Sequence, residues 1–395
     1  MSWPVVKVGD VCSLMTGGTP KTSVNEFYDN GTVPWIVSGD VHKQEIFDCD
    51  KRITKHAVEN SNARYLPKDS VLIALNGQGK TRGTVALLRI NGATCNQSIV
   101  SLNPKDKDEL FSDYLFYYLK SQYQNIRNIT GDKDRAGLNM PLIRQIEIPL
   151  PPLSEQKRIA AILDKADAIR RKRQQAIQLA DDFLRAVFLD MFGDPVTNPK
   201  GWEVRPLGEL ASKIGSGATP KGGKEAYHSE GISLIRSLNV HDDKFLHKDL
   251  AFIDEWQANA LSNVEVKVGD VLLNITGASV CRAAMVDESI LPARVNQHVC
   301  IIRSKDLVPQ YVLHTILSRS FKRNLLNLAG AGGATREALT KAQIEGLLIP
   351  IAPKPLQQKF AKIKNIIRNA NKKSLLASDV PMFKSLSQKA FSGAL

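Results

Sequence analysis

One segment of the 395-residue chain has the residue types of a nucleotide-binding loop. Residues 74–81 (ALNGQGKT, Ala74 to Thr81) follow an apolar run and fit a relaxed phosphate-loop pattern, with alanine in place of the first glycine. A phosphate loop opens a helix, whose N-terminal N–H groups hold the phosphates. Residues 82–90 instead have the pattern of another β-strand. The segment therefore predicts a polar, basic hairpin loop, and an NTP-binding enzyme using residues 74–81 is the alternative.

No other arrangement of residues in the sequence indicates catalysis. There is no Asn-Pro-Pro-Tyr or Asp-Pro-Pro-Tyr motif, with which adenine methyltransferases hold a flipped base, and no Gly-x-Ser-x-Gly elbow. The acidic pairs 132/134 and 242/243 lie in polar, loop-like stretches typical of solvated surface. Five cysteines without a C-x-x-C pair favour buried apolar side chains over disulfides or zinc ligands. We expect no catalytic residue, metal ligand or cofactor of its own in this chain.

The composition is that of a folded, basic protein. The chain has 53 Lys and Arg against 40 Asp and Glu, a net charge of +13, and 43% hydrophobic residues. A basic excess of this kind favours a polyanionic partner, most often nucleic acid. No apolar run approaches about 18 residues, and the start lacks a signal-peptide pattern. We therefore expect no membrane association and a cytoplasmic location.

The chain repeats itself at an offset of about 200 residues. Each copy begins with a tryptophan and a Gly-acid step, continues through a Gly-rich Thr-Pro-Lys turn and an Asn-Gln pair, and closes with Ile-Pro and a proline-rich hinge. Short β-branched runs, Gly/Pro turns and helical stretches near 111–127 and 308–326 predict a mixed α/β domain in each copy. The matching pairs are Trp3 and Trp202, Lys21 and Lys221, Gly77 and Gly277, Asn96 and Asn296, and Ile148 and Ile349.

A long helix is expected after each hinge. Apolar residues at alternating three- and four-residue steps within 154–192 are typical of a coiled-coil seam about 57 Å long. The second copy keeps this rhythm until Pro381, which predicts a kink near 378–381 followed by a short helix through Phe391. The predicted seam residues are Ile159, Ile162, Ala166, Ile169, Ala176, Phe183 and Val187 in the first helix, and Phe360, Ile363, Ile367, Ala370 and Ala377 in the second.

Two apolar helix stripes in one chain bury each other most simply when the helices pair antiparallel. The predicted fold class is α+β, with mixed domains at 1–150 and 196–352 and helices at 151–195 and 353–395. The helices form a coiled coil that joins and separates the domains with pseudo-two-fold symmetry. Two basic domains at a fixed separation suit two half-sites on duplex DNA, which recur about every 34 Å. A coiled-coil adaptor that binds no DNA is the other alternative.

The ordered, doubled motifs resemble the specificity subunit of type I restriction-modification systems along essentially the whole chain. The resemblance rests on the two Trp…Gly-acid starts, the Gly-Gly-Thr-Pro and Gly-Ala-Thr-Pro turns, the hinge 148–156 (IPLPPLSEQ), the run 191–195 (MFGDP) and the C-terminal 390–395 (AFSGAL). The second hinge departs from the family pattern because Leu356-Gln357-Gln358-Lys359 lacks the usual Glu-Gln pair, and Pro381 departs as well.

This resemblance implies a non-catalytic subunit with two target-recognition domains. Each domain would read one half of a split, asymmetric sequence in double-stranded DNA, and the paired helices would fix the spacer. The helices would also dock two modification subunits, which carry S-adenosylmethionine and methylate adenine. Restriction subunits, which use ATP as motor-nucleases, would join through them. No cofactor is implied for this subunit.

Phosphate contacts position a DNA-binding protein, and contacts to base edges specify the sequence. Expected backbone anchors are Lys21 and Lys221 after the Gly/Thr turns, with Lys80, Arg82 and Arg282 on the equivalent hairpins. Base readers should lie on loops and differ between copies, with Arg suiting guanine and Asn or Gln suiting adenine. The predicted readers are Asn76, Gln78 and Arg135 in the first domain, and Arg236, Ser279, Arg294 and Arg336 in the second.

Overall fold

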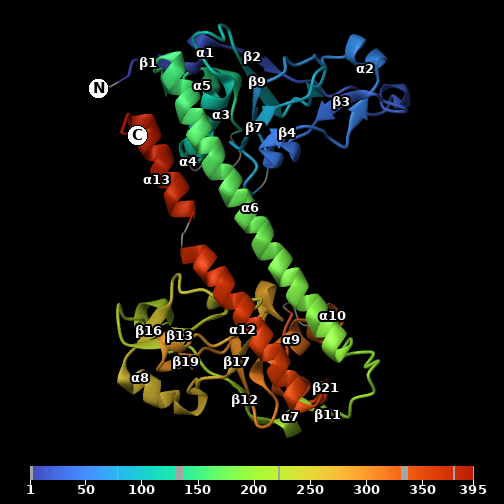
Figure 1. Cartoon of the computed structure of the whole chain (residues 1–395), viewed down its shortest axis with the longest axis vertical. Coiled ribbons are helices and arrows are strands. Elements are labelled where there is room, and N and C mark those ends of the chain that lie inside the picture. Colours follow the sequence, from blue (N-terminus) through green and yellow to red (C-terminus); the bar gives the residue numbers. More distant parts are fainter. Residues whose placement is uncertain are drawn as a thin grey trace. The chain divides into compact units, whose positions relative to one another are not determined.

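The computed structural model describes residues 3–77, 79–129, 137–220, 223–330, 337–376 and 379–394. For residues 223–224, 371–376, 379–382 and 384 the description is confined to the backbone. The chain divides into two compact units, one of Met1–Gln174 with Leu375–Leu395 and the other of Gln175–Ser374 (Figure 1). Each unit contains one globular domain and parts of the long helices, so we describe each by itself.

The globular domain of the first unit is built of small sheets. A five-stranded sheet has the order β2-β9-β6-β7-β4, a three-stranded sheet has the order β5-β3-β8, and β1 pairs with β10. The strands are β1 (Val5–Lys7), β2 (Cys12–Thr16), β3 (Val33–Ile36), β4 (Glu45–Ile46), β5 (Arg52–Ile53), β6 (Val71–Ala74), β7 (Val85–Leu88), β8 (Thr94–Cys95), β9 (Ile99–Pro104) and β10 (Glu147–Pro149). The helices are α1 (Val8–Val11), α2 (Lys55–Glu59), α3 (Ser112–Ser121), α4 (Tyr123–Asn128) and α5 (Met140–Arg144), with 3-10 turns η1 (Asn25–Phe27) and η2 (Asp40–Lys43).

The globular domain of the second unit repeats this plan. Its sheets have the orders β12-β20-β17-β18, β16-β13-β19, β11-β21 and β14-β15. The strands are β11 (Val204–Pro206), β12 (Ala211–Ser216), β13 (Ile232–Ile235), β14 (Val240–His241), β15 (Lys244–Phe245), β16 (Ala251–Ile253), β17 (Val271–Asn274), β18 (Ala283–Met285), β19 (Ala293–Val295), β20 (Val299–Ser304) and β21 (Leu348–Pro350). The helices are α7 (Leu207–Leu210), α8 (Glu255–Ala260), α9 (Pro309–Leu317), α10 (Arg319–Gly330) and α11 (Lys341–Glu345), with 3-10 turns η3 (Gly223–Ala226), η4 (Ser237–Asn239), η5 (Ser262–Val264), η6 (Gly277–Ser279) and η7 (Glu288–Ile290).

The central strand β6 is apolar at every position because both of its faces are buried. Side chains alternate between the two faces of a strand. Val71 and Ile73 pack into the core beneath α3, while Leu72 and Ala74 pack into a second core on the other face. Strand β17 divides in the same way between two cores of the second unit. Burial on both faces thus favours apolar residues along these strands. The exception is the buried Asn274 of β17, whose amide donates to Ser237 O and Val240 O.

The first and last strands of each domain pair with each other just before the long helix. Val6 lies opposite Ile148 in the antiparallel pair β1–β10, and Arg205 lies opposite Ile349 in β11–β21. The predicted Ile-Pro steps are therefore the closing strands of the two domains.

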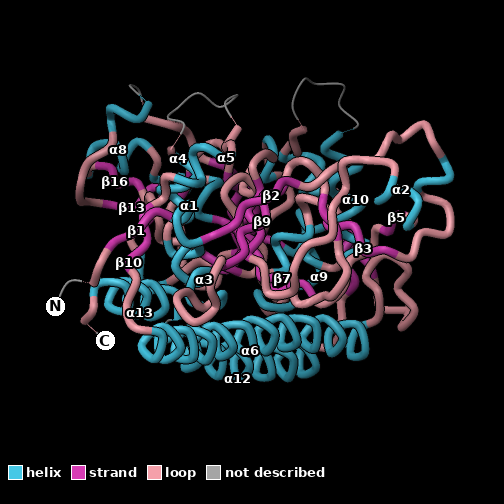
Figure 2. Tube along the Cα trace, turned by 90° about the horizontal axis from the view of Figure 1, so that it is seen from above, coloured by secondary structure: helices cyan, strands magenta, loops and turns pink. Residues whose placement is uncertain are grey.

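The predicted long helix is present as α6 (Leu153–Phe192), which has 40 residues. The second helical region consists of α12 (Lys354–Leu376) and α13 (Asp379–Ser392). Pro381 lies in the first turn of α13, where a missing N–H is tolerated. In the second unit α12 lies beside the C-terminal half of α6, and in the first unit α13 lies beside the N-terminal half (Figures 1 and 2). None of the described helices combines the length and apolar character needed to cross a membrane.

The seam prediction is correct at some positions and wrong at others. Ile159, Ala166 and Phe360 are buried. Ile162, Val187, Ile363 and Ile367 are partly buried. Ile169, Ala176, Phe183 and Ala370 are exposed, and Ala377 lies outside the described residues.

A difference in period explains these errors. A strict seven-residue repeat drifts about 20° per heptad around a straight helix. The residues of α6 that are buried instead stay on one straight face that packs on the globular domains: Gln156, Ile159, Ala160, Leu163, Ala166, Asp167, Leu184, Phe188 and Phe192.

Phe360 is the aromatic contact between α12 and α6, because its ring lies 5.3 Å from that of Phe188 and 5.7 Å from that of Phe192. We predict that Phe360→Ala lowers the free energy of unfolding of the second unit by about 3–5 kcal/mol in urea titrations. Ile366→Ala, at a side chain that is 70% exposed, is the matched control and should change it by less than about 0.5 kcal/mol. Equal effects of the two variants would contradict this packing.

Candidate nucleic-acid interface

Four segments of the first unit meet at one edge, which we call the first loop edge (residues 17–21, 75–84 apart from 78, 96–98 and 137–139). Main-chain hydrogen bonds connect them: Gly18 N donates to Cys95 O (2.9 Å), Leu75 N to Ser98 O (2.8 Å) and Leu138 N to Leu75 O (3.0 Å). The Gly-rich turn and the β6–β7 hairpin, which the sequence placed on DNA separately, therefore belong to one surface.

The second unit has the same arrangement, the second loop edge (residues 217–220, 275–282, 296–298 and 337–339). Ile275 N donates to His298 O (3.0 Å), and Leu339 N donates to Ile275 O (2.8 Å). Gly217 N donates to Asn296 O (3.1 Å). The two edges thus share their backbone framework.

The Gly/Thr turns need glycine because each turn lies very close to the backbone of a neighbouring segment. A Cβ atom on Gly17 would lie 2.0 Å from the carbonyl oxygen of Cys95, and one on Gly217 would lie 1.8 Å from that of Val295. Each turn therefore packs backbone against backbone.

The repeated asparagine supports the edge from within, and the glutamine beside it is exposed. Asn96 Oδ1 accepts a hydrogen bond from Ser98 N (3.2 Å), and Asn296 Oδ1 accepts one from His298 N (3.0 Å). Gln97 and Gln297 are both exposed. The asparagines therefore hold the turn, while the glutamines lie on the exposed surface of the edge.

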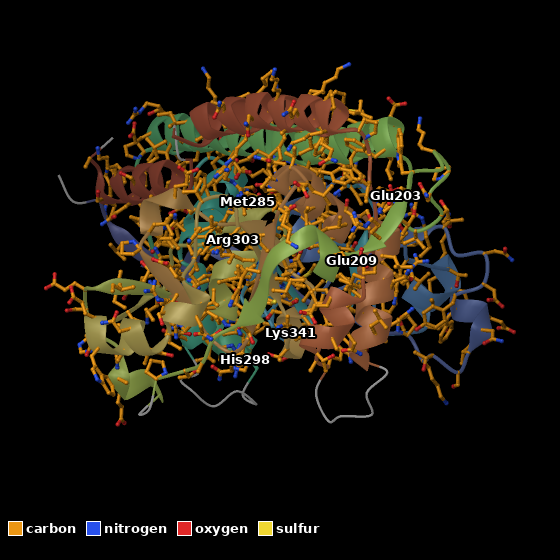
Figure 3. All side chains as sticks on the ribbon, turned by 90° about the horizontal axis from the view of Figure 1, so that it is seen from below. Glu203, Glu209, Met285, His298, Arg303 and Lys341 are labelled. Carbon is orange, nitrogen blue, oxygen red and sulfur yellow. The ribbon has the colours of Figure 1, made fainter. Side chains whose placement is uncertain are left out.

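The side chains on this shared framework differ between the units. On the second edge, Thr276 Oγ1 lies 2.6 Å from His298 Nδ1, Gln297 Nε2 lies 3.2 Å from His298 Nε2, and the Gln297 amide contacts the Thr219 hydroxyl. The first edge has Asn76 in place of Thr276 and Ser98 in place of His298. Within its unit, His298 lies on the side away from α12 (Figure 3). The polar network of the second edge is therefore presented on the face opposite the helix.

The hairpin after β6 has the form expected of a loop and lacks the helix of a phosphate loop. The chain turns at residues 80–83 and continues as β7. Tyr123 of α4 donates to Lys80 O (2.8 Å), and His42 Nε2 lies 3.0 Å from Thr81 Oγ1. In the described residues 75–77 and 79–84, no helix begins whose N-terminus could bind phosphates, so the geometry contradicts the nucleotide-binding alternative.

The predicted DNA-binding residues fall into three groups. Lys21, Asn76 and Lys80 are exposed on the first edge, and Ser279 and Arg282 are partly exposed on the second. Arg82, Arg236 and Arg294 are partly or fully buried. Gln78, Arg135, Lys221 and Arg336 lie outside the described residues.

Two of the predicted arginine readers are bound by their own domain. Arg294 is 8% exposed, and its guanidinium donates to the carbonyl oxygens of Ala258 (3.1 Å) and Ala293 (3.0 Å). Arg236 lies over the ring of Tyr227 and donates to Asp249 O. In this conformation both guanidinium groups are committed within the domain.

Sequence reasoning missed Gln297, His298 and Thr276. Gln297 belongs to an Asn-Gln pair that is identical in both copies, so its sequence alone gives no sign that it reads one of two unlike half-sites. The available signal was the residue after the pair, which is serine in one copy and histidine in the other. A difference at matched positions of a repeat is what two unlike half-sites would require.

The cysteines have the structural role that their spacing predicts. All five are buried and free. Burial raises the pKa of the Cys12, Cys95 and Cys300 thiols to about 12, so these side chains are neutral and poor nucleophiles at neutral pH.

Comparison with known proteins gives one consistent result. The family described as type I restriction modification DNA specificity domain matches residues 1–179 and 199–377. The chain is 26% identical over 384 residues to the type I restriction enzyme MjaIX specificity subunit of Methanocaldococcus jannaschii, covering 91% of this chain and 85% of that protein. It is 22% identical to the EcoKI specificity subunit of Escherichia coli, covering 100% and 89%.

A similar fold is found in the type I restriction-modification S subunit from M. genitalium. That crystal structure matches with a TM-score of 0.60 at 16% identity, covering 98% of this chain and 96% of that one. Because the family matches both copies of the repeat, each with its own loop edge, the chain belongs to the type I restriction modification DNA specificity family and is the DNA specificity subunit of such a system.

Proposed function

We propose that the two loop edges each read one half of a bipartite, asymmetric target in double-stranded DNA. The observation that carries this proposal is the shared backbone framework with different side chains, Asn76 and Ser98 on one edge and Thr276 and His298 on the other. Amide and imidazole groups can distinguish bases through hydrogen bonds in the major groove.

The long helices set the spacer between the half-sites in this proposal. Support comes from the order of contacts within each unit: the start of α6 shares a core with Ala390 of α13, and its end shares a core with Phe360 of α12. These partners run in the opposite direction along the chain, as an antiparallel pair requires. At 1.5 Å per residue, the 40 residues of α6 span about 60 Å.

The exposed sides of the helices dock two modification subunits. Large apolar side chains remain uncovered there, with Leu179 69% and Phe183 56% exposed on α6 and Ile366 70% exposed on α12. Exposed apolar side chains of this size favour a protein partner. S-adenosylmethionine would bind to those subunits, which methylate adenine, and ATP to the restriction subunits that join them. Such a complex would act on DNA in the cytoplasm.

Exchange of one domain tests the modular reading. We predict that replacing residues 1–150 by the corresponding domain of another family member changes one half of the methylated motif, because each edge reads its half alone. Sequencing of methylated adenines in the host genome measures this. A change in both halves, or in neither, would contradict the proposal.

Lengthening the helices tests the spacer. One heptad inserted after residue 174, with a matching heptad after residue 376, adds about 10 Å and nearly preserves the buried face. We predict a target whose spacer is longer by about three base pairs, at 3.4 Å each, with unchanged half-sites. An insertion of equal length in the exposed loop at residue 197 is the control. An unaltered spacer in the lengthened variant would count against the helices as the ruler.

The lysines of the first loop edge should bind phosphates. For Lys21→Ala and Lys80→Ala, we predict weaker DNA binding by the assembled complex and a salt dependence reduced by about 0.9 in log–log slope for each lost contact. Lys7→Ala removes an exposed lysine from β1, beside the hinge, and should leave the slope unchanged. Fluorescence anisotropy at several salt concentrations measures the slope, and the same slope in all variants would place the DNA elsewhere.

A further inference from the structure

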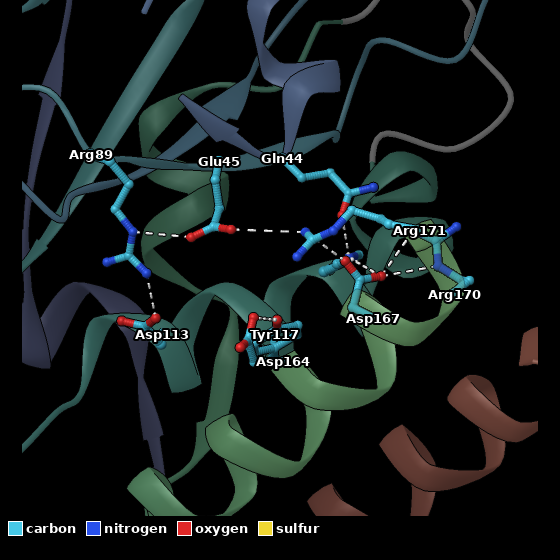
Figure 4. A network of polar contacts seen from close by, with 10 residues as sticks. Gln44, Glu45, Arg89, Asp113, Tyr117, Asp164, Asp167, Arg170 and Arg171 are labelled. Carbon is cyan, nitrogen blue, oxygen red and sulfur yellow. Dashed lines mark hydrogen bonds and ion pairs between the residues drawn. The ribbon is translucent and has the colours of Figure 1, made fainter. Parts of the chain in front are cut away.

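A buried ion pair joins the first globular domain to α6. Lys120 of α3 lies 3.2 Å from Asp167 Oδ1 of α6 and donates to Gln44 Oε1 at 2.6 Å. The Asp167 side chain is 1% exposed, and Arg170 and Arg171 also contact it (Figure 4). Burial alone would raise the pKa of Asp167, but the surrounding cations hold it below its ordinary value. In this pair the domain supplies the lysine and the helix supplies the acid. A longer contact beside it has the opposite polarity, because Arg171 of α6 lies 3.8 Å from Glu45 of β4 (Figure 4).

A second ion pair, with a buried lysine and an aspartate whose side chain is 33% exposed, joins the other globular domain to α12. Lys364 Nζ of α12 lies 2.6 Å from Asp243 Oδ1, in the turn between β14 and β15, and His314 Nε2 lies 3.3 Å from Asp243 Oδ2. The Lys364 side chain is 5% exposed. Burial lowers the pKa of Lys364, whereas the pKa of Asp243 is about 2 because His314 and Lys364 outweigh its burial. Here the helix supplies the lysine and the domain supplies the acid.

The two junctions occupy equivalent positions in the repeat, but the lysine is on the domain in the first junction and on the helix in the second. Gln156 and Gln357 make equivalent hydrogen bonds, so they align α6 with α12. In this alignment Lys364 corresponds to Leu163, and Arg368 corresponds to Asp167. Tyr114 and Tyr311 also make equivalent hydrogen bonds, so they align α3 with α9. In this alignment Leu317 corresponds to Lys120. In these two lysine–acid pairs, the first domain therefore carries the cation and the second domain carries the acid.

Exchange of the domains would bring like charges together. The first domain on α12 would bury Lys120 against Lys364 and Arg368. The second domain on α6 would bring Asp243 toward Asp167 and remove Lys120, so that Asp167 would keep only Arg170 and Arg171 of its own helix. A buried charge without its partner is strongly destabilising. Each mispairing therefore removes the cross-junction partner of a buried charge and brings a like charge toward it.

We propose that these two ion pairs of reversed polarity are positioning contacts that assign each target-recognition domain to its own helix. Asp167 and Lys364 act through their partners Lys120 and Asp243, and none of the four needs to touch DNA. The assignment fixes which half-site lies at which end of the spacer. That consequence rests on the proposed function, whereas the assignment itself is a property of the fold.

A domain graft tests the assignment. Residues 204–350 of the full chain are replaced by residues 5–149, whose closing strands pair in the same register. We expect the graft to melt at least about 6 °C below the parent, from the loss of a buried pair. Adding Lys364→Leu and Arg368→Asp, which copies α6 onto α12, should recover most of this loss.

The matched control for the repaired graft carries Lys359→Asp and Lys362→Leu, which make the same charge change at exposed positions of α12. This control should recover none of the melting temperature that the graft loses. A first graft as stable as the parent, or equal recovery by repair and control, would overturn the assignment.

Methylation separates the two proposals. The repaired graft, assembled with modification subunits, should methylate a target that carries the first half-site at both ends. Recovered stability without such methylation would leave the assignment standing and overturn the proposed reading of half-sites.

A charge reversal provides an independent measurement if the grafts fail to fold. Asp243→Lys and Lys364→Asp should each lower the melting temperature of the second unit by about 6 °C or more, and the double variant should regain at least half. Reversal of the exposed pair Arg205 and Glu209, which are 45% and 53% exposed, should have little effect. Additive losses in the Asp243/Lys364 double variant would overturn the pairing.

Discussion

The direction in which each long helix leaves its domain depends on one buried glutamine. A buried amide is costly unless its donors and acceptor are satisfied. Gln156 accepts from Phe111 N and donates to Glu109 O and Pro151 O, and Gln357 accepts from Val308 N and donates to Ala352 O. These bonds join the start of α3 or α9, the proline hinge and the helix in one network. The family's Glu-Gln hinge therefore keeps its essential residue in the second copy, where only the glutamate is replaced, by Leu356. A rigid junction of this kind is what a helix needs if it is to set a distance.

The same framework leaves the loop edges free to vary. Their backbone positions come from main-chain hydrogen bonds, such as Leu75 to Ser98 and Ile275 to His298, which do not depend on the side chains concerned. Serine can therefore be exchanged for histidine without moving the turn. The asparagine before it is not free in this way, because its side chain holds the turn. A duplicated domain can thus keep its fold and read two unlike sequences.

The sequence predicted those parts of the fold that local chemistry determines. Glycines packed against backbone, Ile-Pro closing strands and the strand after residue 84 all follow from signals within a few residues. The helix seam could not be predicted in the same way, because α6 has apolar residues on more than one face. Which face is buried depends on distant contacts, such as those of Gln156 with the segment before α3. The heptad pattern predicted that Phe183 is buried, whereas packing on the globular domain buries Leu184 and Phe188 instead.

The candidate site was harder to predict because positive charge has two uses in this chain. The net charge of +13 favours DNA, yet several cations neutralise acids inside the protein. Arg89 bonds Glu45, Asp69 and Asp113 at once, and Arg303 pairs with the fully buried Asp270. Such arginines cannot be told from DNA-contacting ones by residue type. Their distinguishing property is an acid or carbonyl supplied by a remote segment, as Ala258 supplies one to Arg294. Lys21 and Lys80 are exposed, and in the described part of the chain no acid or carbonyl group pairs with their side chains, so they are the stronger candidates for contacts to DNA.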